Sequence, residues 1–325
     1  MVLLHGMGAG VGLWLLNLEH FSTHRKIYAI DLPGFGRSFR KKHSEKLSAE
    51  DAETEFISAV ESWRKSMNLN QFILLGHSLG GYLASAYALQ HSQFVKGLIL
   101  VDSWGFPRRS VDEGEKDKNN TQRPSLTWRV VRLIYTTVNP NPLSVLRVAG
   151  PLGPSLISKY RPDLVQKFKH KNMKEDSIIA NYVYHCNAQE PRLNHHNYSG
   201  EVAFKSMVEG LAWAKHPMID RIGHLPSHIP ITMINGRKSW VDYNICHEVK
   251  KIRGQGIVNV EIIDHAGHHV YADQSDVFNK TVKKTCQSYD RLYQKKLDDT
   301  KALSNKDLFL CDDVDGADHV MNFSL

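Results

Sequence analysis

The chain has 325 residues, of which 42% are hydrophobic and 23% charged, so it is long enough for one large or two modest globular domains. This composition excludes collagen, coiled-coil and fully disordered proteins, and no apolar run approaches the roughly 18 residues that a membrane-spanning helix needs. Lysine and arginine number 41 against 34 aspartate and glutamate, and the resulting net charge of +7 favours an anionic partner.

Basic residues are not interleaved with aromatic ones in any long stripe, so we expect no nucleic-acid partner. An anionic lipid surface is still a candidate partner. The 4 cysteines stand far apart, form no CxxC pair and fit a reducing compartment. No set of side chains has the spacing of a metal site, and we therefore expect neither a metal nor another cofactor.

In chain order, short and nearly continuous apolar runs alternate with helical stretches over the first hundred residues. The predicted strands are 2–4, 27–30, 72–75 and 98–101, and the predicted helices between them are 49–67 and 79–90. Such alternation is typical of an α/β fold, with a mostly parallel sheet flanked by helices on both faces.

The alternation stops between residues 104 and 228, which we interpret as a helical cap inserted into an α/β core of residues 1–103 and 229–292. The second part of the core contains predicted strands at 229–234 and 258–263 and a closing helix at 277–292. Residues 293–325 are polar, and we expect a disordered tail there. Within the cap, the apolar residues of 126–138 share one helical face, which would either contact an anionic lipid interface or pack on the core.

The strand at 72–75 leads into Gly76-His77-Ser78-Leu79-Gly80, followed by a helix rich in small residues. A GxSxG pentapeptide is common by chance, but a strand before it and a helix after it are typical of a nucleophile elbow, with Ser78 as the nucleophile. Gly76 and Gly80 are expected there because a Cβ at either position would collide with the crossing strand and helix.

A serine hydroxyl is a poor nucleophile until a base takes its proton, and an acid must hold that base in the right tautomer. Asp242, on the loop after the strand 229–234, is the predicted acid. Asp102 directly follows the strand 98–101 and is the rival for this role.

Three histidines compete for the role of the base on the loop after the strand 258–263. We predict His268, because Gly267 before it allows a sharp turn that brings the imidazole back over the sheet edge. His265 and His269 are expected on the loop rim.

Acyl transfer also needs backbone donors that stabilise the oxyanion. The predicted donors are the amide of Leu79, at a helix N-terminus, and the amide of Met7, in the HGxG-type loop His5-Gly6-Met7-Gly8. His268 and Asp273 also form an H-x4-D motif, a spacing that some glycerolipid acyltransferases use.

These residues, and further stretches over most of residues 1–290, resemble the α/β-hydrolase fold. Within it they are similar to the abhydrolase domain-containing protein four and five group of lipid enzymes and lipase co-activators. The stretches that carry this resemblance are 31–38, 103–107, 182–187, 213–217, 221–224 and 269–274. The family has further strands before the first one seen here, so the amino-terminal strands of the sheet are expected to be missing.

The two branches of this group differ at the elbow, where the protein-five branch has asparagine and resembles a scaffold that activates a triglyceride lipase. Ser78 implies the hydrolytic, protein-four-like branch, whose members deacylate N-acyl phosphatidylethanolamine and its lyso form. The resemblance also places Leu79 in the oxyanion hole and Asp242 and His268 in the triad.

The expected protein is therefore a serine hydrolase of the lipase or phospholipase type, which cleaves acyl esters of phospholipids or lysophospholipids. It would be cytoplasmic and bind peripherally to intracellular membranes or lipid droplets. Two alternatives stay open: a lysophosphatidic acid acyltransferase, on the basis of H-x4-D, and a non-catalytic lipid-droplet adaptor whose partner is a triglyceride lipase.

Overall fold

The computed structural model describes residues 1–41, 47–109, 143, 149–160, 165–168, 177–187, 199–210 and 212–311. Six strands in this part of the chain form one sheet in the order β2-β1-β3-β4-β7-β8, and each of its pairings is parallel. The strands are β1 (Val2–Leu4), β2 (Tyr28–Ile30), β3 (Phe72–His77), β4 (Val95–Val101), β7 (Ile231–Gly236) and β8 (Val258–Ile263).

All six predicted strands are present, and they differ from expectation only at their ends. The strand predicted from residue 229 begins at Ile231, because Pro230 has no amide hydrogen with which to enter the ladder. The carbonyl of Pro230 still accepts a hydrogen bond from the amide of Leu98, at 2.9 Å. β4 begins earlier than predicted, at Val95, which pairs with Phe72.

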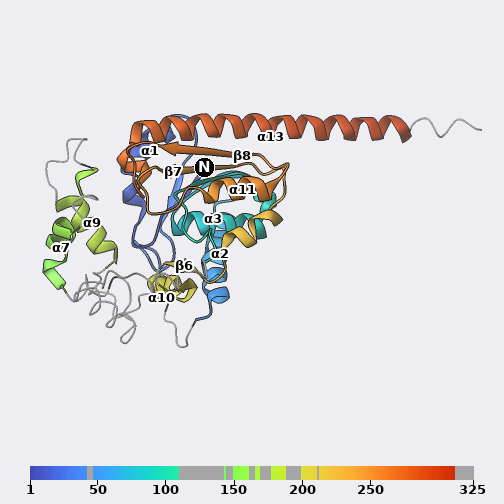
Figure 1. Cartoon of the computed structure of the whole chain (residues 1–325). Coiled ribbons are helices and arrows are strands. Elements are labelled where there is room, and N and C mark those ends of the chain that lie inside the picture. Colours follow the sequence, from blue (N-terminus) through green and yellow to red (C-terminus); the bar gives the residue numbers. More distant parts are fainter. Residues whose placement is uncertain are drawn as a thin grey trace, which may run out of the picture.

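Helices cover both faces of the sheet, as expected (Figure 1). A hydrophobic core lies on each face of the sheet. Because successive side chains of a strand point to opposite faces, Val2 and Leu4 of β1 belong to one core and Leu3 to the other. The first layer holds α2 (Ala49–Ser66), α3 (Leu79–Gln90) and α11 (Ile245–Arg253); the second holds α1 (Leu15–Ser22), the short α12 (Val270–Asp273) and α13 (Ser275–Cys311).

Helix α3 is the central helix of the first layer, and nearly all of its residues are buried. Small side chains such as Gly81 and Ala84 let it lie close to the sheet directly after Ser78. α2 begins at the cap residue Ser48, whose hydroxyl accepts the amide of Asp51 at 3.0 Å. These two helices are joined at their buried faces by Tyr82, which donates to Glu53 at 2.7 Å.

The segment predicted to be a cap has no strand in the main sheet among its described residues. It contains α7 (Gly153–Tyr160), α9 (Ser177–Asn187), α10 (Ser199–Met207), the two-stranded β5 (Val208–Glu209) and β6 (Trp213–Ala214), and the 3-10 turns η3 (Gly150–Leu152), η4 (Met218–Asp220) and η5 (Ile222–His224). The predicted helix at 126–138 lies outside the described residues, and the division into core and cap stays a prediction.

The segment predicted to be a cap contacts the loop after β2. Gly34 has a φ of 77°, and a Cβ on it would lie 1.9 Å from the main-chain nitrogen of Gly200, in the first turn of α10. Only a glycine at position 34 permits this close approach. The cap helix α10 is thereby seated on the carboxyl end of β2.

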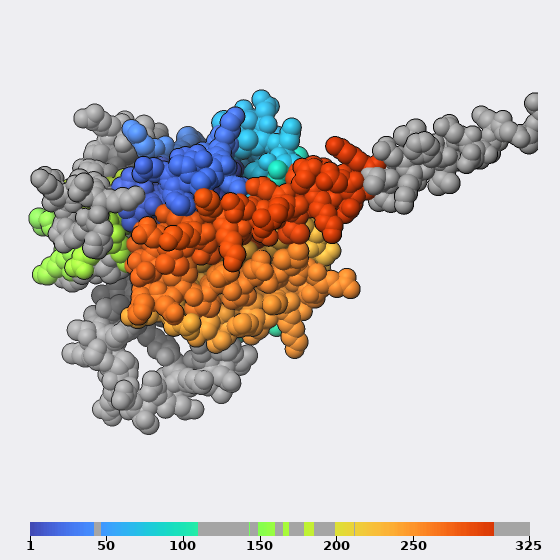
Figure 2. All heavy atoms as spheres, turned by 90° about the horizontal axis from the view of Figure 1, so that it is seen from above, coloured from blue at the N-terminus to red at the C-terminus, as the bar shows by residue number. Residues whose placement is uncertain are grey.

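The carboxyl-terminal helix α13 runs for 37 residues, from Ser275 to Cys311, and extends beyond the sheet (Figure 1). Its first part packs between the amino-terminal segment and the segment of β8 and α11 (Figure 2). The prediction of disorder from residue 293 is therefore wrong for residues 293–311, while 312–325 lie outside the described residues. No glycine or proline interrupts this stretch, and Gln294 supports it by an i,i+4 hydrogen bond to Asp298.

None of the helices that the structure describes is long and apolar enough to cross a membrane.

Candidate active site

The predicted nucleophile lies at the turn between β3 and α3. Ser78 has φ 53° and ψ −118°, a strained conformation for a residue with a side chain. Its amide donates to the carbonyl of Val101 at 3.0 Å, and its carbonyl accepts the amides of Gly81 at 3.0 Å and Trp104 at 3.2 Å. These main-chain bonds hold Ser78 at the carboxyl edge of the sheet, where the residue is 9% exposed.

The two elbow glycines are required by close backbone contacts. A Cβ on Gly76 would lie 2.1 Å from the carbonyl oxygen of Gly80, and a Cβ on Gly80 would lie 2.3 Å from the carbonyl oxygen of Leu4. These are the collisions with the crossing strand and helix that the sequence predicts. A side chain at either position would force β1, β3 and α3 apart.

His268 lies on the loop after β8 and pairs with Asp102. Its Nδ1 is 2.6 Å from Asp102 Oδ2, and because a carboxylate only accepts, Nδ1 must carry the proton. Asp102 follows β4 directly, has a φ of 44° and is completely buried. Nε2 of the neutral imidazole is then left unprotonated, which is the form that a general base requires.

Three further donors fix the buried carboxylate of Asp102. The amide of Gly236 and the side-chain nitrogen of Asn235 each lie 3.2 Å from Oδ1, and the hydroxyl of Ser239 donates to Oδ2. Asn235 is itself held by the thiol of Cys246, whose Sγ is 3.2 Å from Asn235 Oδ1. Burial, and then the Asp102 charge, raise the pKa of Cys246 to about 12, which keeps it a thiol donor.

The predicted partnership of His268 with Asp242 is not what the structure contains. Asp242 is exposed, and its Oδ1 accepts the amide of Asn244 at 2.9 Å. The rival Asp102 holds the imidazole instead, because it lies buried at the sheet edge with donors on both oxygens. Sequence reasoning named Asp102 but missed Asn235 and Ser239, whose polar side chains lie at the end of β7 and just after it.

The loop around His268 is shaped by its neighbours. His265 is exposed with a φ of 61°, and His269 is half-buried. The indole of Trp240, 61% exposed, lies with its ring centre 5.1 Å from that of His268. His268 and Trp240 therefore lie next to each other on the side of the site that faces solvent.

Asp273, the second residue of H-x4-D, does not bond the imidazole of His268 in this structure. Its Oδ2 accepts the amide of Gly267 at 2.8 Å, and its Oδ1 pairs with Lys167 at 2.9 Å. The carboxylate thus fixes the turn before His268 and connects it to a cap residue.

The predicted oxyanion residues flank the elbow. Leu79 is the first residue of α3, so its amide has no acceptor within the helix. On the other side, a Cβ on Gly6 would lie 3.1 Å from Ser78 Cβ, which places the loop of Gly6 and Met7 against the nucleophile. The assignment of Leu79 and Met7 to an oxyanion hole stays a prediction.

The conformation of this loop is set by His5 and Asp31. Nε2 of His5 accepts the amide of Leu32 at 2.9 Å, so Nδ1 carries the proton and donates to the carbonyl of Gly6 at 2.7 Å. Burial lowers the pKa of His5, which favours this neutral form.

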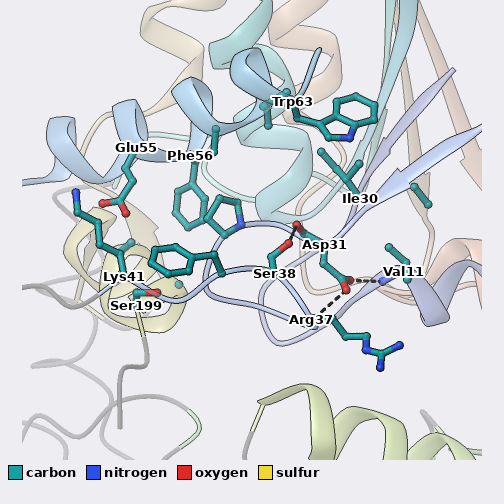
Figure 3. Close-up of a pocket in the computed structure, with 17 residues that line it drawn as sticks. Val11, Ile30, Asp31, Arg37, Ser38, Lys41, Glu55, Phe56, Trp63 and Ser199 are labelled. Carbon is teal, nitrogen blue, oxygen red and sulfur yellow. Dashed lines mark hydrogen bonds between the residues drawn. The ribbon is translucent and has the colours of Figure 1, made fainter. Parts of the chain in front are cut away.

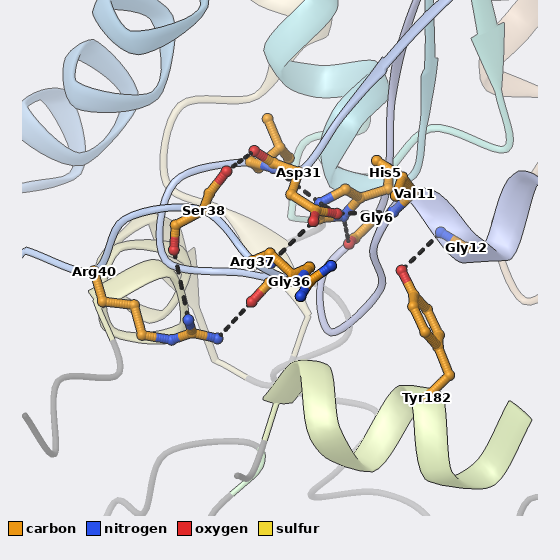
Figure 4. A network of polar contacts seen from close by, with 11 residues as sticks. His5, Gly6, Val11, Gly12, Asp31, Gly36, Arg37, Ser38, Arg40 and Tyr182 are labelled. Atoms are coloured by element: carbon orange, nitrogen blue, oxygen red, sulfur yellow. Dashed lines mark hydrogen bonds and ion pairs between the residues drawn. The ribbon is translucent and has the colours of Figure 1, made fainter. Parts of the chain in front are cut away.

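Asp31 connects its own loop, which follows β2, to the segment after β1, as Figure 4 shows. Its Oδ1 accepts the amide of Val11 at 2.8 Å, and its Oδ2 accepts that of Arg37 at 2.9 Å. The hydroxyl of the cap residue Tyr182 reaches the same region and accepts the amide of Gly12 at 2.7 Å. Asp31 lies within residues 31–38, which carry the family resemblance, but the sequence alone indicates no role for it.

A cavity of about 600 Å³ lies beside β2, and its lining does not include Ser78, Asp102 or His268 (Figure 3). Its walls are apolar where α2 faces β2, at Phe56, Val60 and Trp63, and Arg37 and Lys41 add cationic groups. Since Asp31 also lines it, the cavity adjoins the oxyanion-side loops rather than the triad.

The described residues contain no group of three or more His, Cys, Asp or Glu side chains that could hold a metal ion.

Known proteins are similar to this chain over most of its length. A family described as alpha/beta hydrolase fold matches residues 1–275. The (lyso)-N-acylphosphatidylethanolamine lipase of Bos taurus is 45% identical over 291 residues, which cover 89% of this chain and 80% of the relative. The 1-acylglycerol-3-phosphate O-acyltransferase ABHD5 of Rattus norvegicus is 44% identical over 291 residues, covering 89% and 78%.

Solved structures share the fold at low sequence identity. A membrane phospholipase A described as a bacterial virulence factor has a TM-score of 0.58 at 19% identity, covering 89% of this chain and 78% of that one. The 2-hydroxy-6-oxo-6-phenylhexa-2,4-dienoate hydrolase of Rhodococcus has a TM-score of 0.59 at 18% identity, covering 88% and 89%. The resemblance stated from the sequence is thereby confirmed for the fold and for the protein four and five group.

Proposed function

The chain belongs to the α/β-hydrolase fold family, and from this premise we propose that it is a serine hydrolase that cleaves acyl esters of glycerophospholipids. The observation that carries the proposal is the pairing of His268 Nδ1 with the buried Asp102 at 2.6 Å, beside a strained elbow that bears Ser78. That arrangement has the parts that acyl transfer through a serine requires.

In the first half of the reaction, Ser78 Oγ attacks the acyl carbonyl carbon while His268 Nε2 takes the hydroxyl proton. The carbonyl oxygen becomes an oxyanion, which the amides of Leu79 and Met7 stabilise. His268 then gives the proton to the departing lysophospholipid hydroxyl as the carbon–oxygen bond breaks. Asp102 keeps the imidazole in the required tautomer and stabilises its cation during both transfers.

In the second half, water attacks the acyl-serine while His268 takes one of its protons. The acyl–Ser78 bond breaks, the proton returns to Ser78 Oγ, and a fatty acid leaves. The products of one cycle are one fatty acid and one deacylated lipid.

N-acyl phosphatidylethanolamine and its lyso form are the substrates that we propose within this class. The support is the 45% identity to the lipases named for these lipids in Bos taurus and Mus musculus, over 89% of this chain. Because such lipids reside in bilayers, the protein would act at the surface of an intracellular membrane or lipid droplet, with the net charge of +7 favouring anionic surfaces.

Lysophosphatidic acid acylation is the second candidate, and the 44% identity to the acyltransferase of Rattus norvegicus favours it. In that reaction a lipid hydroxyl replaces water as the acceptor of the acyl group. The contacts of Asp273 with Gly267 and Lys167 give this carboxylate a structural task and leave His268 to Asp102. This geometry favours hydrolysis through Ser78 over an H-x4-D dyad.

A two-part lipid assay separates these functions. Vesicles containing N-acyl phosphatidylethanolamine report fatty-acid release, and lysophosphatidic acid with an acyl thioester donor reports phosphatidic acid. Fatty-acid release by the wild type that is lost in Ser78→Ala supports the proposal. Phosphatidic acid formation that survives Ser78→Ala but not Asp273→Asn would contradict it in favour of the acyltransferase. Activation of a triglyceride lipase that is equal for the wild type and Ser78→Ala, without hydrolysis by either, would support the adaptor.

A further inference from the structure

The elbow residue before the nucleophile, His77, has no role in the chemistry described above. It is the last residue of β3 and is 2% exposed. A buried imidazole at a catalytic turn is costly unless its polar atoms are used, so each of its contacts is informative.

The first contact joins the elbow to the loop of the base. His77 Nε2 is 2.9 Å from the main-chain carbonyl oxygen of His268, and because a carbonyl only accepts, Nε2 must carry the proton. The two rings also approach, with their centres 4.7 Å apart. One side chain therefore ties the residue next to the nucleophile to the backbone of the general base.

The second contact joins the elbow to the oxyanion-side loop. A Cβ on Gly6 would come within 2.9 Å of His77 Nδ1, so the main chain of this loop lies directly against the imidazole. Trp14 and Tyr271 pack on the remaining sides, with ring centres 6.4 and 4.9 Å away. This packing leaves the imidazole little freedom to turn.

The imidazole is held in its neutral form. Nδ1 is buried and, among the described residues, has no hydrogen-bond partner that would stabilise a second proton. Burial first, and then the nearby His268, His269 and His5, keep the pKa of His77 well below its usual range. A neutral His77 adds no positive charge beside His268, and so it does not oppose protonation of the base during turnover.

We propose that His77 is a positioning residue for catalysis: its Nε2–H holds the backbone of His268 while its ring supports the oxyanion-side loop at Gly6. One side chain then holds the nucleophile, the base and the oxyanion donor Met7 in fixed positions relative to one another. This inference rests on the proposed serine hydrolase function, and it adds a residue that acts through His268 rather than on the substrate.

Two variants of nearly equal size isolate the hydrogen bond. Glutamine places an amide N–H near the position of His77 Nε2, whereas methionine has a similar length without a donor. His77→Met is expected to lower kcat about 10- to 100-fold, the size of loss that removing a hydrogen bond behind a metal-binding histidine causes. KM should stay within about twofold, because His77 does not line the substrate's path in this mechanism. His77→Gln should recover most of the lost kcat.

The experiment measures kcat and KM for fatty-acid release from N-acyl phosphatidylethanolamine vesicles, and the rate of inactivation by a fluorophosphonate, which needs no lipid. Melting curves of both variants and of His77→Phe, which keeps an aromatic ring, identify any that does not fold. A higher kcat in His77→Gln than in the folded donor-free variants supports the proposal. Equal kcat with and without the donor, whether high or low, would overturn it. Failure of the proposed function is distinct, since the wild type itself would then be inactive in both assays.

Discussion

Replacing Asp102 by asparagine is the change that most sharply separates this site from the one expected from sequence. The carboxylate accepts four hydrogen bonds, two at each oxygen. At Oδ1 both donors, the amide of Gly236 and the side chain of Asn235, point at the carboxylate. At Oδ2, Ser239 has a hydroxyl that can rotate and become an acceptor.

An asparagine at position 102 must therefore place its oxygen at the Oδ1 position and its NH₂ group toward His268. Nδ1 of the imidazole is then forced to accept, the proton moves to Nε2, and the base cannot take the Ser78 proton. Loss of the correct tautomer costs about 10⁴-fold in kcat in a serine protease triad. At about 1.4 kcal/mol per tenfold, this is about 5.5 kcal/mol of transition-state stabilisation.

The assay is the steady-state rate of fatty-acid release, with a melting curve to show that the variant is folded. Asp242→Asn is the matched control, because Asp242 is exposed and contacts Asn244 rather than His268. Its kcat should stay within about threefold of the wild type, as for surface changes away from the chemistry. A large loss in Asp242→Asn with little loss in a folded Asp102→Asn would refute the assignment.

Two further predictions concern the scaffold of the site. Gly80→Ala should lower the free energy of unfolding by about 1 to 3 kcal/mol and reduce the fluorophosphonate reaction rate, because its Cβ would lie 2.3 Å from the Leu4 carbonyl. Unchanged melting and reactivity would contradict this. Hydrogen bonds from Arg64 and then Tyr87 lower the pKa of the buried Glu61 from its usual value of about 4.5 to about 2. The ionised carboxylate therefore contributes its whole stabilisation of the fold at pH values above about 4.5 and loses it as the pH falls toward 2. The melting-temperature advantage of the wild type over Glu61→Gln should therefore shrink as the pH falls from 5 toward 2, and a constant difference would count against it.

Much of the fold follows from local pattern. The strand at 2–4 and the helix at 79–90 have the predicted bounds, since a short apolar run and a small-residue helix directly after a glycine-containing turn leave few alternatives. The strand at 258–263 also matches, because its alternating side chains mark a half-buried edge strand.

The triad acid could not be chosen from sequence because Asp102 and Asp242 both follow strands that end at the same sheet edge. Only the folded structure distinguishes them. Asp102 is buried and accepts hydrogen bonds from residues at the end of β7 and just after it, whereas Asp242 is exposed to solvent. The tail differs from its prediction for another reason. Its polar composition predicts disorder, but no helix breaker interrupts residues 293–311, and a helix tolerates polar residues on all sides when i,i+4 contacts support it.

The most direct test of the central claim is a fluorophosphonate reaction of the intact chain, read by protein mass and by peptide mapping. We expect a single adduct on Ser78, absent from Ser78→Ala and formed far more slowly in Asp102→Asn. A folded wild type that takes up no probe, or an adduct that persists in Ser78→Ala, would contradict the claim that this chain is a serine hydrolase.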